Sequence, residues 1–207
     1  MAEFDLIVFG ASGFTGKLVA EYVHANYPDR PWAMAGRNAE KLAAVRDELG
    51  LPAETPLIEA DASDPESINA MVQRVRVFIT TVGPYLLYGE ALVAACAEHG
   101  TDYVDLSGEP PFMWDMIEKY SEKAKSTGAR IVHSCGFDSV PFDMGVYFLQ
   151  AAAKERFGAP LRDVKCRVRS MAGTAAGGTA AAGAETAKLA QSDPGVLKRL
   201  MSPFALT

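Results

Sequence analysis

The chain has 207 residues, of which 49% are hydrophobic, a length that suits one full domain and part of another. Its net charge of −6, without a cluster of lysine and arginine, argues against nucleic-acid binding, and no apolar run approaches the roughly 20 residues of a membrane span. Three widely separated cysteines argue against a disulfide framework or a zinc site, and a first segment without the pattern of a secretory signal predicts a cytoplasmic protein.

Short β-rich runs alternate with longer helical patterns over the first 133 residues. The predicted strands are Phe4–Phe9, Trp32–Ala35, Leu57–Ala60, Val77–Thr81, Tyr103–Leu106 and Arg130–His133. This alternation is typical of βαβ units, in which parallel strands are joined by crossover helices. We therefore predict an α/β fold with a Rossmann-type, doubly wound parallel sheet.

Apolar spacing and capping residues mark the helices between these strands. The first predicted helix has an apolar stripe expected to face the core: Leu18, Val19, Tyr22 and Val23. Asp64 before Pro65 predicts a helix start, and Gly100 predicts the end of the helix over 90–99.

The pattern changes after His133. We expect a helix over 146–157, a half-exposed strand with alternating Val164, Cys166 and Val168, and another helix from near Thr179. Residues 1–140 are thus predicted to form one domain. Residues 141–207 are too few for an independent substrate domain and are predicted to begin a second, α+β domain.

The segment VFGASGFTG, residues 8–16, places three glycines directly after the first apolar run. In a doubly wound fold the first strand enters its helix through a tight turn, where backbone N–H groups hold the pyrophosphate of a dinucleotide. We assign Gly10 to the turn, Gly13 to the approach of the phosphates and Gly16 to helix–strand packing. The spacing differs from the dehydrogenase form G-x-G-x-x-G, and a purely structural turn is the alternative.

The end of the second strand indicates which dinucleotide binds. NAD enzymes carry an acidic residue there, whereas this chain has Gly36 and Arg37, and an arginine pairs with the 2′-phosphate of NADP(H). The alternative is a solvated Arg37, with Asn38 or Glu40 binding the ribose. Asp61, at the end of the third strand, is assigned either to the adenine side or to a helix cap.

With these residues the chain resembles the saccharopine dehydrogenase-like oxidoreductase family, and within it the branch of trans-acting enoyl reductases. The matching segments are FGASGFTG, AGRN, TTVGPYLLYGEALVAACAEHGTDYVDLSGE and HSCGFDSVPFDMG, which cover much of residues 8–145. GGT at residues 177–179 resembles a family segment midway along a longer chain. The resemblance therefore implies that this is the N-terminal part of a longer protein.

The resemblance implies an NADP(H)-binding Rossmann domain followed by a partial substrate and dimerisation domain, and a homodimer at full length. It places these residues on the pyrophosphate: Gly10, Ser12, Gly13, Phe14, Thr15 and Gly16. It places Arg37 on the 2′-phosphate, and Val82 and Gly83 beside the ribose. It also implies hydride transfer, which the nicotinamide supplies while the protein positions it.

Ligands of open α/β sheets bind beyond the carboxyl ends of the strands. The polar residues that follow the last three strands are Tyr85, Asp105, Ser107, Glu109, Cys135 and Asp138. Tyr85 is a candidate general acid, with a packing role as the alternative. Asp105 and Glu109 are expected either to orient a substrate amine or the nicotinamide ribose, or to join loops and cap helices.

Cys135 is a second candidate acid, or a buried filler of a small site. Asp138 is expected to cap the helix that starts near Pro141, with a substrate role in addition. His133 has no partner at metal-ligand spacing, and we assign no metal. The Tyr-x-x-x-Lys pattern of short-chain dehydrogenases is absent from the sequence.

We therefore expect an NADP(H)-dependent oxidoreductase of lipid metabolism. Its substrate is expected to be a small molecule or an acyl chain, with hydride transferred to an activated C=C bond of an acyl or polyketide-like lipid. Two alternatives stay open: oxidation or reduction at a C–N bond, as in saccharopine enzymes, and a non-catalytic NADP-binding sensor or scaffold.

Overall fold

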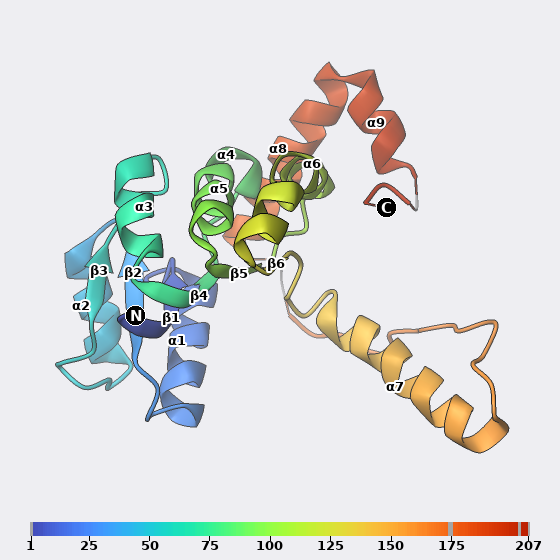
Figure 1. The fold of residues 1–207 in the computed structure, drawn as a ribbon, viewed down its shortest axis with the longest axis horizontal. Helices are drawn as coiled ribbons and strands as arrows, with labels where there is room; N and C mark the ends of the chain where they lie inside the picture. The colour runs from blue at the N-terminus through green and yellow to red at the C-terminus, as the bar shows by residue number, and fades with distance from the viewer. Residues whose placement is uncertain (1, 174–175, 203, 207) are drawn as a thin grey trace.

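The computed structural model describes residues 2–173, 176–202 and 204–206, and its centre is a six-stranded parallel sheet (Figure 1). The strands follow the order β3-β2-β1-β4-β5-β6. Their bounds are β1 (Phe4–Phe9), β2 (Trp32–Gly36), β3 (Leu57–Glu59), β4 (Val75–Thr80), β5 (Asp102–Asp105) and β6 (Ile131–Val132). All six predicted strands are confirmed, with small differences at their ends, and the order reverses between β1 and β4 as in a Rossmann fold.

Helices cover the sheet on both faces. The helices of the described residues are α1 (Phe14–Asn26), α2 (Ala39–Glu48), α3 (Pro65–Val72), α4 (Tyr85–Tyr88), α5 (Glu90–His99), α6 (Pro110–Thr127), α7 (Val140–Phe157), α8 (Gly177–Ser192) and α9 (Pro194–Leu200). Helices α1 and α2 pack on one face of the sheet, and α3, α5 and α6 pack on the other.

Successive residues of β1 enter opposite halves of the core. Ile7 and Phe9 pack in the cluster that includes α3, α5 and α6, whereas Val8 packs in the cluster that includes α1 and α2. All three are at most 2% exposed. Burial of each such side chain stabilises the fold by about 1.5–3 kcal/mol, so the central strand is anchored from both sides.

The two helix ends that the sequence marks are confirmed. Asp64 caps α3, accepting a hydrogen bond from the Glu66 N–H at 3.0 Å, with Pro65 in the first turn. Gly100 ends α5 in the left-handed conformation, at φ 72°. The start of α3 and the end of α5 therefore lie where backbone chemistry favours them.

The predicted apolar stripe of α1 is partly wrong. Leu18 is 50% exposed and Tyr22 is 59% exposed, and the buried residues of this helix are Gly16, Ala20 and Val23. Small residues face the sheet because α1 lies close to it. The larger side chains are turned outward.

The strand predicted at Val164, Cys166 and Val168 is also wrong. The described part of the chain has no strand after β6, and residues 164–168 are irregular, with Cys166 and Val168 exposed. A strand is stable only when hydrogen bonds pair it with a neighbour, and no described segment pairs with this one. The described residues beyond 140 form three helices and irregular segments, so the expected α+β character is not seen there.

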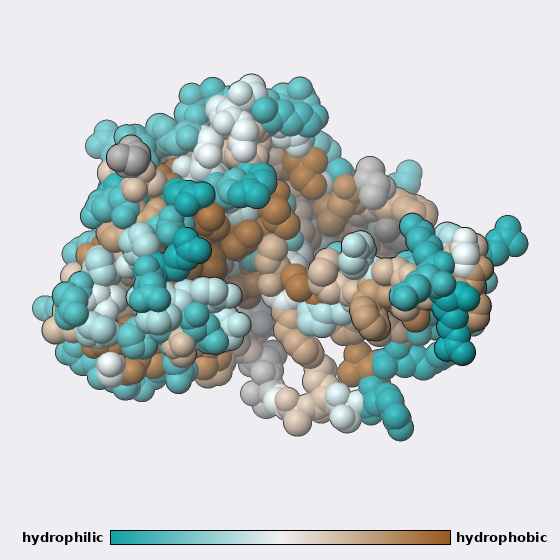
Figure 2. All heavy atoms as spheres, turned by 60° about the horizontal axis from the view of Figure 1, so that its bottom comes forward, coloured by the Kyte–Doolittle hydropathy of each residue, from teal (hydrophilic) through white to brown (hydrophobic). Residues whose placement is uncertain are grey.

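Helix α7 extends away from the sheet (Figure 1), and only Ala153 is buried along it. Met144, Tyr147 and Phe148 are among its exposed apolar residues. Apolar side chains also reach the surface on the face shown in Figure 2. Among the described residues, no helix combines the length and apolar character that crossing a membrane requires.

The turn between β1 and α1 brings the backbone of the helix against that of the strand. Gly10 has φ +85°, a conformation that disfavours side chains, and its N–H donates to the Ala35 carbonyl at 2.9 Å. A Cβ added to Gly16 would lie 2.1 Å from the Gly10 carbonyl oxygen. Glycine at both positions therefore permits the close approach of α1 to the sheet.

Gly16→Ala is expected to lower the free energy of unfolding by about 3 kcal/mol, because the added methyl overlaps a backbone carbonyl that cannot move aside. Urea unfolding followed by far-ultraviolet circular dichroism measures the change. Gly145→Ala in α7 is the matched control, since nothing lies within 4 Å of its added Cβ. Equal stability of the two variants would contradict the close contact.

Candidate cofactor-binding site

A pocket of about 450 Å³ opens at the carboxyl ends of the first four strands. Its wall is formed by four segments: the β1–α1 turn, the end of β2, and the segments that follow β3 and β4. The lining residues are Phe9, Gly10, Ser12, Gly13, Gly36, Arg37, Ala60, Asp61, Ala62, Thr81, Val82, Gly83, Pro84 and Tyr88. The predicted residues Gly10, Ser12, Gly13, Arg37, Asp61, Val82 and Gly83 are thus brought together.

Three predicted pyrophosphate residues, Phe14, Thr15 and Gly16, do not line this pocket but form the first turn of α1. Their N–H groups have no intrahelical acceptor, since the first such bond runs from Lys17 N–H to the Gly13 carbonyl at 2.9 Å. No side chain caps this helix, and its first turn has no acidic residue. The end of α1 is therefore suited to an anion through backbone groups.

Arg37 lies at the end of β2 with an exposed side chain on the pocket. It forms no ion pair within the described parts of the chain. The neighbouring Asn38 caps α2, accepting a hydrogen bond from Lys41 N–H at 2.7 Å, so its side-chain oxygen is engaged. Arg37 is thus the cationic side chain on the pocket wall, as binding of a 2′-phosphate requires.

Asp61 lines the same end of the pocket. Its carboxylate accepts from the Ser63 N–H at 2.9 Å and from the Ser63 hydroxyl at 2.7 Å, and these bonds, aided by the Arg37 charge, lower its pKa. The helix-cap alternative for Asp61 is wrong, because Asp64 caps the helix that follows. Its contact with the adenine side stays a prediction.

Tyr85 is 5% exposed and lies in the interior. Its hydroxyl donates to the Thr80 carbonyl at 3.1 Å, its ring packs on Phe112, and burial raises its pKa. These contacts favour the packing interpretation. A general-acid role for Tyr85 stays a prediction that would require its hydroxyl to leave the Thr80 carbonyl.

Asp105, 2% exposed, joins the loops that follow β5 and β6. One oxygen accepts from the Ser107 and Ser134 N–H groups at 2.9 and 2.8 Å, and the other lies 2.7 Å from His133 Nδ1 and accepts from the Tyr103 hydroxyl at 2.8 Å. Ser134 is held with φ 58°. Sequence reasoning missed the contact with His133, because a buried Asp–His pair across two strands leaves no local spacing signal.

Glu109 is 1% exposed and accepts hydrogen bonds from the N–H groups of Tyr85 and Leu86 at 2.8 and 2.9 Å. It therefore caps α4, which precedes it in the chain. Glu109 also occupies the N-cap position of α6, but its side chain does not cap that helix. Together with Asp105 it fits the loop-and-cap alternative for these two carboxylates.

Cys135 is partly buried beside β6, and burial, with the nearby Asp105, raises the pKa of its thiol. The expected cap by Asp138 is wrong: α7 begins at Val140, its cap position is Ser139, and no side chain caps it. The helix starts one residue earlier than Pro141, which places Asp138 before the cap. Catalytic or substrate roles for Cys135 and Asp138 stay predictions.

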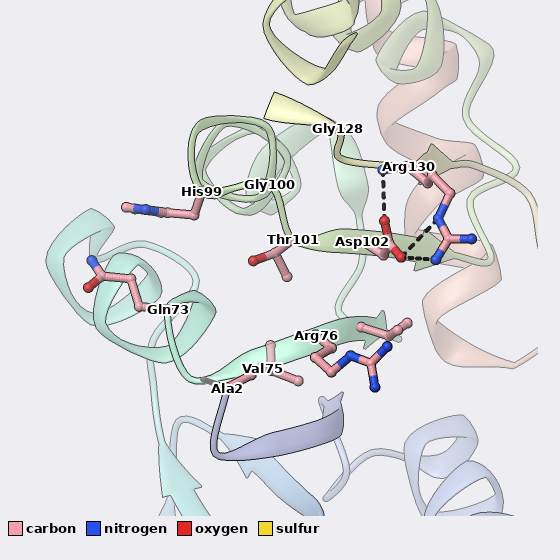
Figure 3. Close-up of a pocket in the computed structure, with 11 residues that line it drawn as sticks. Ala2, Gln73, Val75, Arg76, His99, Gly100, Thr101, Asp102, Gly128 and Arg130 are labelled. Atoms are coloured by element: carbon pink, nitrogen blue, oxygen red, sulfur yellow. Dashed lines mark hydrogen bonds and ion pairs between the residues drawn. The ribbon is translucent and has the colours of Figure 1, made fainter. Parts of the chain in front are cut away.

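A second hollow of about 720 Å³ lies at the opposite, amino ends of β4 and β5 (Figure 3). Its charged groups are already paired, Arg130 with Asp102 and Arg76 with Asp5. It contains none of the predicted site residues. Among the described residues, no group of three or more His, Cys, Asp or Glu side chains is placed to hold a metal ion.

Curated relatives match almost the whole chain. A Mycobacterium tuberculosis protein is 50% identical over 99% of this chain. Proteins of Mycobacterium bovis and Mycobacterium ulcerans, both named trans-acting enoyl reductase, are 44% and 42% identical over 99% of it. The match covers 49–50% of each relative, so the chain spans about half the length of these relatives.

Solved structures share the fold at low identity. A saccharopine dehydrogenase (L-Glu forming) from Saccharomyces cerevisiae gives a TM-score of 0.59 at 18% identity, over 75% of this chain and 32% of that one. A Citrobacter sp. triphenylmethane reductase complexed with NADP(H) gives 0.50 at 18% identity, over 72% of this chain and 56% of that one.

The family model for the saccharopine dehydrogenase NADP-binding domain matches residues 6–132. That range runs from β1 to β6 and contains the residues that line the pocket. The NADP(H) cofactor predicted from Gly36 and Arg37 agrees with it. The chain belongs to the saccharopine dehydrogenase NADP-binding domain family.

Proposed function

We propose that this chain is the cofactor-binding part of an NADPH-dependent enoyl reductase that acts on an activated C=C bond of an acyl or polyketide-like lipid. The observation that supports the reaction is the 42–44% identity, over 99% of the chain, to relatives named trans-acting enoyl reductase. The homodimer and the cytoplasmic location stay predictions.

The residues of the pocket fit NADP(H). The uncapped first turn of α1 would bind the pyrophosphate, Arg37 the 2′-phosphate, and the segment Val82–Gly83 the ribose on the other side of the turn. When bound, the nicotinamide supplies the hydride. The chain's own contribution is to bind and orient the dinucleotide at the edge of the sheet.

The first experiment measures cofactor preference. Arg37→Ala is expected to weaken NADPH binding about 10- to 100-fold, because it removes a charge-assisted pair with the 2′-phosphate, and to leave NADH binding unchanged. Calorimetric titration of both nucleotides gives the affinities.

Arg76→Ala is the matched control, since Arg76 is an exposed arginine at the far end of the strands. It is expected to leave both affinities unchanged. An Arg37→Ala variant that loses NADPH and NADH binding equally, or neither, would refute the assignment of Arg37 to the phosphate.

The second experiment tests the reaction. A full-length relative that contains this region is mixed with NADPH and an α,β-unsaturated acyl thioester, and loss of reduced-nicotinamide absorbance is followed. Oxidation of NADPH that depends on the thioester is expected, and product analysis should find the saturated acyl chain. The same protein with a 2-oxo acid and an amine tests the C–N alternative.

If NADPH is oxidised with the oxo acid and amine but not with the thioester, C–N chemistry would replace the enoyl proposal. Tight NADPH binding without turnover of the thioester, or of the oxo acid and amine, would favour a sensor or scaffold. This chain is assayed in parallel, so that the contribution of the remaining half of the relative is measured directly.

A further inference from the structure

Glu109 is a buried carboxylate whose partners are backbone amides and not cations. Its side chain is 1% exposed and takes part in no ion pair within the described residues. Burying a charge without a counterion is costly unless hydrogen bonds compensate it. Here the compensation comes from the successive N–H groups of Tyr85 and Leu86, at 2.8 and 2.9 Å.

These two amides directly follow a wall of the cofactor pocket. Val82, Gly83 and Pro84 line the pocket just before Tyr85, and Tyr88 lines it from the last residue of α4. Glu109 itself does not line the pocket. Its carboxylate therefore fixes the segment 82–88, which lines the pocket, through contacts that lie outside the pocket.

The other contacts of the segment are neutral. The Val82 N–H donates to the Thr80 hydroxyl at 3.2 Å, and the Tyr85 hydroxyl donates to the Thr80 carbonyl at 3.1 Å. Hydrogen bonds to a charged acceptor are stronger than neutral ones and fix direction more firmly. The two oxygens of Glu109 thus hold successive N–H groups of residues 82–88, a two-point restraint that the Thr80 contacts do not provide.

The topology assigns this wall to one half of the dinucleotide. The two mononucleotide-binding halves of a doubly wound sheet meet between β1 and β4, with the adenosine half on the β2 side, where Arg37 lies. The segment after β4 lies on the opposite side and would therefore face the nicotinamide half.

We propose that Glu109 is a positioning residue that fixes the nicotinamide side of the pocket and leaves the adenosine side unaffected. The inference rests on the proposed binding of NADP(H). In this proposal Arg37 binds the adenosine end of the ligand directly. Glu109 acts at the nicotinamide end without contacting the ligand, by holding the segment that lines the pocket there.

The test uses two probes on this chain. NADPH spans both ends, whereas adenosine 2′,5′-bisphosphate reaches only the adenosine end. Glu109→Gln keeps the size of the side chain but offers one carbonyl oxygen where the carboxylate offers two acceptors. We expect NADPH affinity to fall about tenfold or more, and that of adenosine 2′,5′-bisphosphate to stay within about twofold, in calorimetric titrations.

Glu98→Gln is the matched control, because Glu98 is an exposed carboxylate paired with Lys123. It is expected to change neither affinity. Circular dichroism establishes that each variant is folded. If Glu109→Gln does not fold, Glu109→Asp, which keeps the charge and withdraws the carboxylate by one methylene, is measured with the same expectation.

An equal loss of both affinities, or no loss of either, would overturn the inference. Failure of both variants to fold even with excess NADPH would also overturn it, since Glu109 would then be a requirement of the fold. If the unchanged chain binds neither probe, the proposed function fails first and the inference falls with it.

Discussion

The contact between the Gly10 carbonyl and Gly16 determines how closely α1 approaches the sheet, and the candidate cofactor site depends on that approach. Without side chains at the two positions, the first turn of α1 lies directly at the end of β1. Ser12 and Gly13, which directly precede that turn, then line the same pocket as the end of β2 and the segment after β4. A site that binds phosphate through backbone atoms requires this proximity more than any single side chain.

The sheet was predictable because its strands are apolar runs of β-favouring residues separated by helical patterns, some of them with clear capping residues. Asp64 and Gly100 illustrate why this works: each satisfies backbone groups within a few residues, so the signal is local. The outward orientation of Leu18 and Tyr22 was not predictable from spacing alone. It depends on the distance between α1 and the sheet, which Gly16 and Ala20 permit.

The same distinction, between local sequence signals and contacts made only in the folded chain, separates the predicted site residues from the missed contacts. The glycine turn and Arg37 follow directly from the positions of predicted strands, and the pocket brings them together. The contacts of Asp105 with His133 and of Glu109 with Tyr85 join segments more than twenty residues apart in the sequence. Only the lateral pairing of β4, β5 and β6 creates these contacts. The strand expected at Val164 was wrong for a related reason, since alternation cannot supply a pairing partner.

Helix α7, with Ala153 as its only buried residue, has consequences for how the chain opens locally. Tertiary packing supplies most of the stability of helices in proteins, and α7 has little of it among the described residues. The backbone hydrogen bonds of α7 are therefore held almost entirely by the helix itself. Its amide hydrogens should exchange with solvent through local fraying, whereas those of β1 and β4 exchange only when the sheet as a whole unfolds.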